Sequence, residues 1–414
     1  MKLIQINTIA SSFSTGRIAE QIGKLMQTRG WDSYLAYGRF ANASSNRLIK
    51  IGNRFDIALH LLETRLFDRH GLSSKLATKR LIKKIKQLNP DVIHLHNIHG
   101  YYLNYPILFD YLSKAGKPVV WTLHDCWAFT GHCAYFDTAN CYRWKTGCFA
   151  CPLKGIYPRC IGLDRSRENY ADKRHYFNNV KNLTIVTVSQ WLKELVKQSM
   201  LRYDNLLCIH NGIDLNCFRP LEHIDSRYEF GGKKVLLGVC AKWTSEKGFD
   251  DFVQLAKRLD DDYRIVMLGL SGNFRKRLPE NIIAVHRTEN MDVLVQIYNR
   301  ALVLLTLSHN DTYPTTNLEA LACGTPVITY PTGGSPEAID ENTGYIVEAG
   351  NFDAIIDAIR TIDKNGKSHY SAHCRARAER LFNKDLQFAK YGELYKQVTA
   401  SAHNDANNSE NITD

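Results

Sequence analysis

The sequence has no long hydrophobic run. Its longest apolar stretch is Ala301–Leu307, far shorter than the ~18 residues that a membrane-spanning helix needs. The first residues, MKLIQIN, alternate as a β-strand does, and no hydrophobic segment with a small-residue cleavage site follows them, so a secretory signal is not expected. The chain also lacks the Walker pattern G-x-x-x-x-G-K, which excludes a P-loop nucleotide site. We therefore expect a cytoplasmic protein.

The composition excludes wholesale disorder and a collagen-like fibre, because 44% of the 414 residues are apolar. A chain of this length is expected to form two or three domains. Charge is unevenly spread: residues 1–215 carry 30 lysines and arginines against 15 acidic residues, and the remainder carries 23 against 27. The basic half is expected to meet an anionic partner, such as nucleic acid, a phospholipid surface or a phosphorylated small molecule.

Short runs rich in Val, Ile and Leu alternate with segments of helical periodicity in both halves of the chain, which predicts two doubly wound α/β domains. We place the boundary within Asn216–Gly232, giving domains over 1–218 and 219–400, with the last helix packing back on the first domain. The polar residues 401–414 are expected to form a disordered tail. The predicted strands are Leu3–Asn7, Asp91–His96, Val119–Leu123, Leu183–Val188, Val235–Val239, Arg264–Leu268, Leu302–Leu307 and Val327–Thr329.

Ligands of open α/β sheets bind beyond the carboxyl ends of the strands, so we expect the ligand-binding residues in the loops after the predicted strands. After Leu302–Leu307, a helix is predicted from Thr315 to Gly324, and the amides of Thr316 and Asn317 at its start favour a phosphate. Glu319 has the two oxygens needed to bind a ribose diol, and Asp311 enters the same region. The alternative is structural: Glu319 favours the helix N-terminus and Asp311 caps a turn.

Two lysines follow the strand Val235–Val239. Lys242 and Lys247 flank its turn and are suited to neutralise a diphosphate, although loop lysines are usually just solvated. The string Asp260-Asp261-Asp262 resembles a D-x-D metal motif, but it precedes a strand. It therefore lies at the wrong edge of the sheet for a donor site, and we interpret it as a solvated turn.

In the first half, His124-Asp125 ends a buried strand, where the carboxylate is expected to orient the imidazole toward a sugar or hydroxyl. A purely structural histidine is the alternative. Gly16 opens a helix after the first strand, without the spaced glycines of a dinucleotide site. His94, His96 and His99 are interpreted as lining a cleft, since no zinc-protease pattern surrounds them.

The segment 126–160 is a cysteine-rich insertion with few residues able to form a core. Cys133, Cys141, Cys148 and Cys151 include one C-x2-C pair, a spacing common in structural zinc sites. Bound zinc would stabilise such a loop, and reduced, unliganded thiols are the alternative. The reserve ligands are Cys126, Cys160 and His132.

The segment Arg65–Lys86 interleaves basic and apolar residues. Such a segment is able to lie on an anionic lipid surface, or it forms a helix with an ordinary solvated face. These two interpretations remain open.

Several motifs together resemble the retaining nucleotide-sugar glycosyltransferases of family 4, which have the GT-B architecture of two Rossmann-like domains facing each other across a cleft. The strongest is DTYPTTNLEALACGTPVITYPTGGSPE (Asp311–Glu337), which resembles the family's E-x7-E signature and the glycine-rich loop after it. The segments HLHNIHGYYLN and HDCWAFTGHC are similar to those of surface-polysaccharide enzymes that resemble colanic acid glycosyltransferases. Supporting motifs are HNGID (His210–Asp214), AKWTSEKG (Ala241–Gly248) and TLHD (Thr122–Asp125).

The resemblance implies roles for particular residues. Glu319 would bind the ribose hydroxyls, and Asp311 would meet the transferred sugar, although the family has Glu at the latter position. The amides of Thr316, Asn317 and Leu318 would hold phosphate, as would Lys247. Lys242 stands where the family usually has Arg, which removes a bidentate contact. His124 would face the donor sugar, and Gly16 would let the backbone approach the donor or acceptor.

The activity implied is transfer of a hexose from a UDP- or GDP-linked sugar to a growing, lipid-linked glycan, with retention and without a catalytic metal. The implied place is the cytoplasm, with peripheral contact to the anionic inner membrane and no nucleic-acid partner. Two rival hypotheses are a GT-B sugar-nucleotide epimerase and a zinc-stabilised nucleic-acid-binding protein. Against the latter, no recognisable nucleic-acid-binding module is present.

Overall fold

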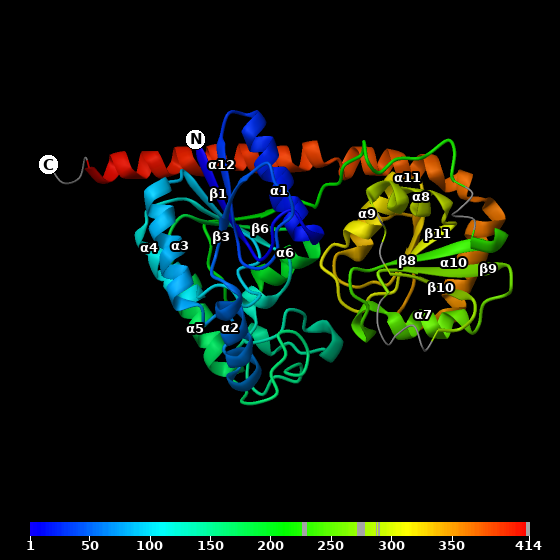
Figure 1. Ribbon diagram of the computed structural model, residues 1–414, viewed down its shortest axis with the longest axis horizontal. Helices are drawn as coiled ribbons and strands as arrows, with labels where there is room; N and C mark the ends of the chain where they lie inside the picture. Colours follow the sequence, from blue (N-terminus) through cyan, green and yellow to red (C-terminus); the bar gives the residue numbers. More distant parts are fainter. Residues whose placement is uncertain (226–229, 271–277, 287, 289, 411–414) are drawn as a thin grey trace. The chain divides into compact units, whose positions relative to one another are not determined.

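The structure is a computed structural model, and it describes residues 1–225, 230–270, 278–286, 288 and 290–410. The chain divides into two units, shown in Figure 1: unit 1 comprises Met1–His210 and Phe388–Asp414, and unit 2 comprises Asn211–Gln387. Each unit is built on one sheet of parallel strands with helices between them. The predicted pair of Rossmann-like α/β domains is confirmed.

The seven strands of unit 1 follow the order β3-β2-β1-β4-β5-β6-β7. The residues of β4, β5 and β6 are buried throughout, as expected for central parallel strands covered on both faces. The strands are β1 (Lys2–Asn7), β2 (Asp32–Tyr37), β3 (Arg47–Lys50), β4 (Val92–Leu95), β5 (Val119–Leu123), β6 (Leu183–Thr187) and β7 (Asn205–Cys208).

Successive residues of these strands serve two separate cores. Val92, Val120 and Val186 pack in one core with side chains of α1 and α12, whereas Ile93, Trp121 and their neighbours face α3, α4 and α5 in the other. The helices of unit 1 are α1 (Phe13–Thr28), α2 (Arg54–Phe67), α3 (Lys75–Leu88), α4 (Tyr105–Lys114), α5 (Ser166–Phe177), α6 (Gln190–Lys197) and most of α12 (Lys384–Glu410).

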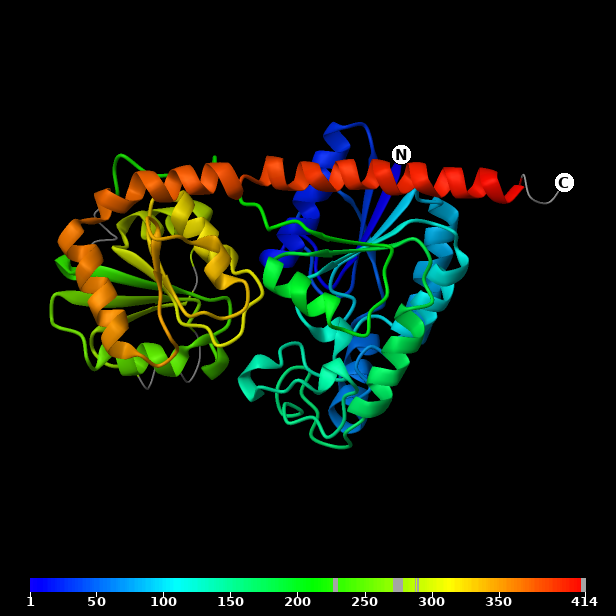
Figure 2. The ribbon, with the colours of Figure 1, turned by 180° about the vertical axis from the view of Figure 1, so that it is seen from behind.

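Helix α12 brings the end of the chain back to unit 1, where it runs beside α1 (Figure 2). Phe388, Tyr391, Leu394 and Tyr395 are buried there. The helix continues to Glu410, which corrects the predicted disordered tail at 401–414 as far as that residue; residues 411–414 lie outside the described chain. Extending an existing helix adds a hydrogen bond for each residue fixed, so a polar composition does not prevent it.

The first segment of unit 1 ends at His210 in the structure, eight residues before the predicted boundary at residue 218. The Ile213 amide donates to the Phe382 carbonyl at 2.8 Å, and the Lys384 amide donates to the Ile213 carbonyl at 3.0 Å. The Lys384 ammonium pairs with Asp214. These contacts join the residues after Asn211 to unit 2.

The sheet of unit 2 has the order β10-β9-β8-β11-β12-β13. Because β8 and β11 are parallel neighbours, the loops that follow them leave the same edge. The strands are β8 (Lys234–Val239), β9 (Tyr263–Leu268), β10 (Ile282–Val285), β11 (Val303–Thr306), β12 (Val327–Thr329) and β13 (Gly344–Ile346). The helices are α7 (Phe249–Ala256), α8 (Met291–Arg300), α9 (Thr315–Ala322), α10 (Phe352–Asn365) and α11 (Lys367–Leu381).

The cysteine-rich insertion lies between β5 and α5 and contains only short 3-10 turns. Contrary to expectation, it does supply core residues. Trp127, Phe129, Phe136 and Trp144 are buried in the larger core of unit 1, and aromatic side chains of this size contribute strongly to burial.

Candidate active site

Two of the predicted site residues meet at the carboxyl edge of the unit 2 sheet. Lys247, in the turn after β8, places its Nζ 2.8 Å from Oδ2 of Asp311, in the loop after β11. The same Nζ donates to the Asn310 carbonyl at 2.6 Å. Both side chains of the pair are about one quarter exposed. The edge therefore presents one positive and one negative group side by side and within reach of a ligand.

Two glycines allow the loops around Asp311 to approach so closely. Gly248 has φ +79°, and a Cβ there would lie 2.0 Å from the Leu307 carbonyl oxygen. Gly333 has φ +57°, and a Cβ there would lie 1.7 Å from the Asp311 carbonyl oxygen. A side chain at either position would thus force the backbones apart.

Glu319 lies on α9 and is only 4% exposed. Its Oε2 accepts a hydrogen bond from the Tyr298 hydroxyl at 2.8 Å, so Tyr298 positions the carboxylate from α8. Tyr298 is not predictable from the sequence, because nothing in its spacing connects it with α9.

The start of α9 has no side-chain cap, since Pro314 occupies the N-cap position. Thr316 is half-buried there, and Asn317 and Leu318 are buried. The Asn317 amide already donates to the Pro314 carbonyl at 3.2 Å, and its side chain bonds Thr306 and Ser335. The helix start nevertheless carries the partial positive charge that favours an anion.

Lys242 is exposed on the loop after β8. Within the described ranges its ammonium forms no ion pair, whereas the ammonium of Lys247 pairs with Asp311. The string Asp260-Asp261-Asp262 precedes β9 and is exposed, with Asp260 paired to Arg360 at 2.8 Å. The predicted solvated turn is confirmed.

In unit 1, His124 follows β5 and forms part of a chain of hydrogen bonds. Its Nε2 lies 3.2 Å from Nδ1 of His96, whose Nε2 lies 3.0 Å from Oε1 of Gln5. Because the Gln5 amide nitrogen donates to Ala19, its oxygen must accept from His96, and His96 must accept from His124. Burial lowers the pKa of His124 to about 4, so the ring is neutral and its Nδ1 is an acceptor.

The Asp125 carboxylate bonds groups other than His124, so its predicted role in orienting that ring stays a prediction. Its Oδ2 lies 2.9 Å from Nε2 of His99, and its Oδ1 accepts from the Trp127 amide at 2.9 Å. Burial raises the pKa of Asp125, but His99 and these hydrogen bonds outweigh it and lower the pKa below its ordinary value. His94 is likewise a core residue rather than a cleft residue, bonding Tyr395 at 2.7 Å.

Gly16 lies buried in the first turn of α1, where its carbonyl accepts from the Ser11 amide at 3.2 Å. A Cβ at Gly16 would lie 3.2 Å from Ile9 Cγ1. The glycine thus allows the loop after β1 to pack against the helix.

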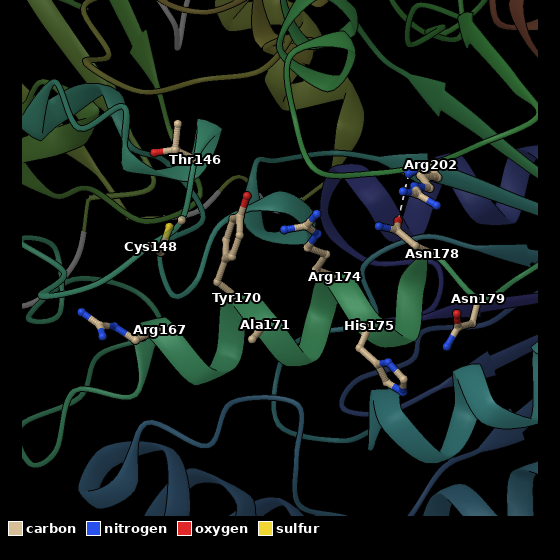
Figure 3. Close-up of a pocket in the computed structure, with 11 residues that line it drawn as sticks. Thr146, Cys148, Arg167, Tyr170, Ala171, Arg174, His175, Asn178, Asn179 and Arg202 are labelled. Atoms are coloured by element: carbon tan, nitrogen blue, oxygen red, sulfur yellow. Dashed lines mark hydrogen bonds between the residues drawn. The ribbon is translucent and has the colours of Figure 1, made fainter.

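A separate basic groove of about 520 Å³ runs along α5 in unit 1. Figure 3 shows Tyr170, Arg174 and Asn178 on the same side of this helix, with Asn178 bonded to Arg202. No carboxylate is among the described residues that line the groove, so it favours an anion. The lining side chains with a positive or titratable nitrogen are Arg167, Arg174, His175 and Arg202.

Cys133, Cys141, Cys148 and Cys151, the predicted zinc ligands, line one small cavity inside the insertion. Across the part of the chain that the structure describes, no three His, Cys, Asp or Glu side chains are already gathered as a metal-binding group. The structure thus brings the thiols to one cavity without assembling them.

Two family profiles match the chain in succession. The family described as "Glycosyltransferase Family 4" matches residues 15–216, and the family described as "Glycosyl transferases group 1" matches residues 222–380. They correspond closely to the two units. No nucleic-acid-binding family is needed to account for either half.

Relatives and solved structures agree with this. A protein named as a colanic acid biosynthesis glycosyl transferase, WcaC of Escherichia coli (strain K12), is 26% identical over 84% of this chain and 87% of its own. The capsular polysaccharide biosynthesis glycosyltransferase CapM of Staphylococcus aureus is 22% identical over 51% of this chain and 60% of its own.

Solved structures share the fold at lower identity. Sucrose-phosphate synthase from Thermosynechococcus elongatus aligns with a TM-score of 0.70 at 16% identity, covering 97% of this chain and 99% of its own. Anabaena Alr3699/HepE in complex with UDP-glucose aligns with a TM-score of 0.66 at 12% identity, covering 96% and 100%. The chain belongs to glycosyltransferase family 4 and is a glycosyltransferase with the GT-B fold.

Proposed function

We propose that this enzyme transfers a hexose from a nucleoside diphosphate sugar to a hydroxyl of a growing glycan, with retention at the anomeric carbon. The observation that carries the proposal is the Lys247–Asp311 pair beside the uncapped start of α9, which also bears Glu319. The Anabaena protein solved with UDP-glucose supports UDP as the nucleotide of the donor, with GDP as the alternative.

The reaction places opposite charges on its two fragments. As the bond from the anomeric carbon to the phosphate oxygen breaks, the diphosphate gains negative charge and the sugar gains positive charge. Lys247, Lys242 and the α9 start stabilise the first, and the Asp311 carboxylate stabilises the second. The acceptor oxygen bonds to the carbon on the same face, and its proton passes to the departing phosphate.

The remaining predicted residues bind rather than react. Glu319, held by Tyr298, is suited to accept hydrogen bonds from ribose hydroxyls. In unit 1, His124 is proposed to face the donor sugar, and Gly16 is proposed to act indirectly, by letting the loop after β1 pack closely against α1. This scheme uses no catalytic metal.

Replacing Glu319 with Gln tests the assignment. The variant keeps an acceptor for Tyr298 but loses the charge, so donor Kd should rise at least about tenfold, the effect of one charged hydrogen bond, while the melting temperature stays close to wild type. Glu341→Gln, at an exposed position of the same unit, is the matched control. Titration calorimetry with a panel of UDP- and GDP-hexoses measures the donor Kd, and nucleotide release measures turnover. Wild-type donor binding by Glu319→Gln would reject the site.

The acceptor is proposed to be a lipid-linked glycan of surface-polysaccharide assembly. The names of the relatives from Escherichia coli and Staphylococcus aureus support the process. The basic groove along α5 supports an acceptor with a phosphate or acid group. Transfer assays with matched neutral and acidic acceptors test the charge requirement, and equal rates with both would reject it.

We also propose that unit 1 rests on the anionic cytoplasmic face of the inner membrane. Helix α2 exposes Phe55, Leu59, Leu62 and Leu66, which share one helical face at spacings of four, three and four. The next helix, α3, exposes basic residues, and lipid headgroups attract such charges. The described chain contains no helix long and apolar enough to cross a membrane. The exposed basic residues of α3 are Lys75, Lys79, Arg80, Lys83, Lys84 and Lys86.

A further inference from the structure

Four thiols from separate parts of the insertion converge on one cavity. Between β5 and α5 the chain has no α-helix or strand, yet it brings all four cysteines of the irregular C-x7-C-x6-C-x2-C series to the same cavity wall. The thiols of Cys133 and Cys151 are close enough to shift each other's pKa, that of Cys133 upward and that of Cys151 downward. The cavity is lined by Cys133, Cys141, Cys148, Cys151 and His132, together with aromatic and other side chains of the insertion.

A buried imidazole in the same wall has one nitrogen without a partner. His132 is completely buried, and its Nδ1 lies 2.5 Å from Oδ1 of Asp68, which is also completely buried. Its Nε2 has no hydrogen-bond partner. Leaving a buried polar atom without a hydrogen bond costs about 1–3 kcal/mol of stability. A group that bonds to Nε2 of His132 beside the thiols would therefore stabilise the fold.

A buried cation lies next to the thiols as well. Lys173 is 1% exposed, and its Nζ donates to the carbonyls of Trp127 and Thr130 at 2.6 and 2.9 Å. Cys133 and Cys148 are close enough to interact with its charge. An ammonium this deeply buried is stabilised when its neighbours carry negative charge, as thiolates do and thiols do not.

We propose that the insertion holds a structural Zn²⁺ bound by Cys133, Cys141, Cys148 and Cys151. Each thiol releases its proton to solvent, and four zinc–sulfur bonds of about 2.3 Å form after the side chains rotate into the cavity. His132 stands behind the ligands in the same cavity wall, and Asp68 holds its ring through Nδ1. Lys173 offsets the charge of the thiolates.

Metal analysis of the full-length wild-type protein, purified without a tag that binds metal, tests the proposal. We expect about one zinc per chain, as for a closed four-thiolate site. Cobalt substitution should give sulfur-to-cobalt charge-transfer absorption and the visible bands of tetrahedral cobalt. A zinc-free wild-type protein, or cobalt bands without the sulfur charge-transfer absorption, would overturn the proposal.

Single substitutions identify the ligands. Cys148→Ser should lose the zinc, whereas Cys126→Ser and Cys160→Ser, at buried cysteines of the same insertion, should keep it. His132→Gln should keep zinc but weaken its affinity about 10–100-fold, because it changes only a group behind the ligands. If Cys148→Ser does not fold, zinc release from wild type during titration with a mercurial thiol reagent replaces it. Zinc kept by soluble Cys148→Ser, or not released by the reagent, contradicts the proposal.

Discussion

Buried histidines give unit 1 an electrostatic character that its basic surface does not reveal. His94 lies on β4 and His96 directly follows it, and both are at most 1% exposed. Both nitrogens of His94 are used, by Tyr395 at 2.7 Å and Thr122 at 2.8 Å. Burial lowers the pKa of His94 to about 3 and places that of His96 well below its usual value. The folded protein therefore holds these rings neutral.

This predicts a loss of stability in mild acid. Below about pH 6.5, the ordinary pKa of histidine, the His94 ring is protonated in the unfolded chain but stays neutral in the folded protein. Each such ring therefore lowers the free energy of unfolding by about 1.4 kcal/mol for each pH unit. The free energy of unfolding should fall between pH 7.5 and 5.5. His309 acts in the opposite direction, because its hydrogen bond to Asp251 raises its pKa.

The ring responsible is identified by comparing pH slopes. His94→Gln should flatten the dependence by about 1.4 kcal/mol between pH 7.5 and 5.5, measured by guanidinium unfolding at both pH values. His373→Gln, at an exposed position of α11, should leave the slope unchanged. An unchanged slope in His94→Gln would mean that its ring titrates normally in the folded state.

The predictability of single residues depended on where their partners lie in the chain. Lys247 and Asp311 follow apolar strands, and parallel strands send such loops to one sheet edge, so their meeting was predictable. Tyr298 beside Glu319 and His99 beside Asp125 were not, because each contact joins segments whose approach depends on tertiary packing. The adjacency of His124 and Asp125 in sequence suggested that the carboxylate orients the ring, but it gave no sign of the bonds that Asp125 makes to His99 and to the Trp127 amide.

Helices α2 and α3 together form an unusual surface at the scale of elements. Phe55 of α2 is 75% exposed, although a single buried Phe side chain contributes about 1.5–3 kcal/mol when removed from water. The basic residues of the following segment are evident from the sequence, but the exposed apolar face of α2 is not. The apolar content of α2 is ordinary, and only the structure shows which of its faces points outward.

Weakening the α2 face should weaken membrane binding. Leu62→Ser removes an apolar group that is 54% exposed, so binding to vesicles containing anionic lipid should fall about fivefold or more, while folding is unaffected. Leu386→Ser, at a position 55% exposed on α12, is the matched control. Cosedimentation with anionic and with zwitterionic vesicles measures the effect. Equal loss in both variants, or no loss in Leu62→Ser, would contradict the proposed surface.

Central elements were predictable from the sequence and edge elements were not. The predicted strands coincide with β1, β4, β5 and β6 and with four strands of unit 2 to within one or two residues, because buried parallel strands are nearly continuous apolar runs. Most of the strands missed are short or lie at sheet edges, where one side is solvated and polar residues are tolerated; β3 (RLIK) and β7 (NLLC) are examples. The exception is β2 (DSYLAY), which has six residues and lies between β3 and β1 but is not a continuous apolar run.

At the scale of the whole molecule, the chain leaves unit 1, forms unit 2 and returns through α12. Helix α12 supplies buried residues to a core of unit 1 and does not merely lie on its surface. Phe388, Tyr391 and Tyr395 pack with Leu3 and Met26, which lie near the start of the chain. The core of unit 1 is therefore complete only after α12 has been synthesised and has packed against it.

Two truncations separate this role from the mere presence of a C-terminal helix. Removing residues 388–414 takes away the buried aromatic side chains of Phe388, Tyr391 and Tyr395. Each contributes about 3–5 kcal/mol, and together they match the roughly 5–15 kcal/mol that typically stabilises a domain. Unit 1 should then fail to fold, and calorimetry should show at most the transition of unit 2. Removing residues 402–414 leaves every one of these residues, and also buried Thr399, in place, so its melting profile should match wild type. A soluble 388–414 deletion with the wild-type profile would show that unit 1 folds without its final helix, and the assignment of α12 to that core would have to be abandoned.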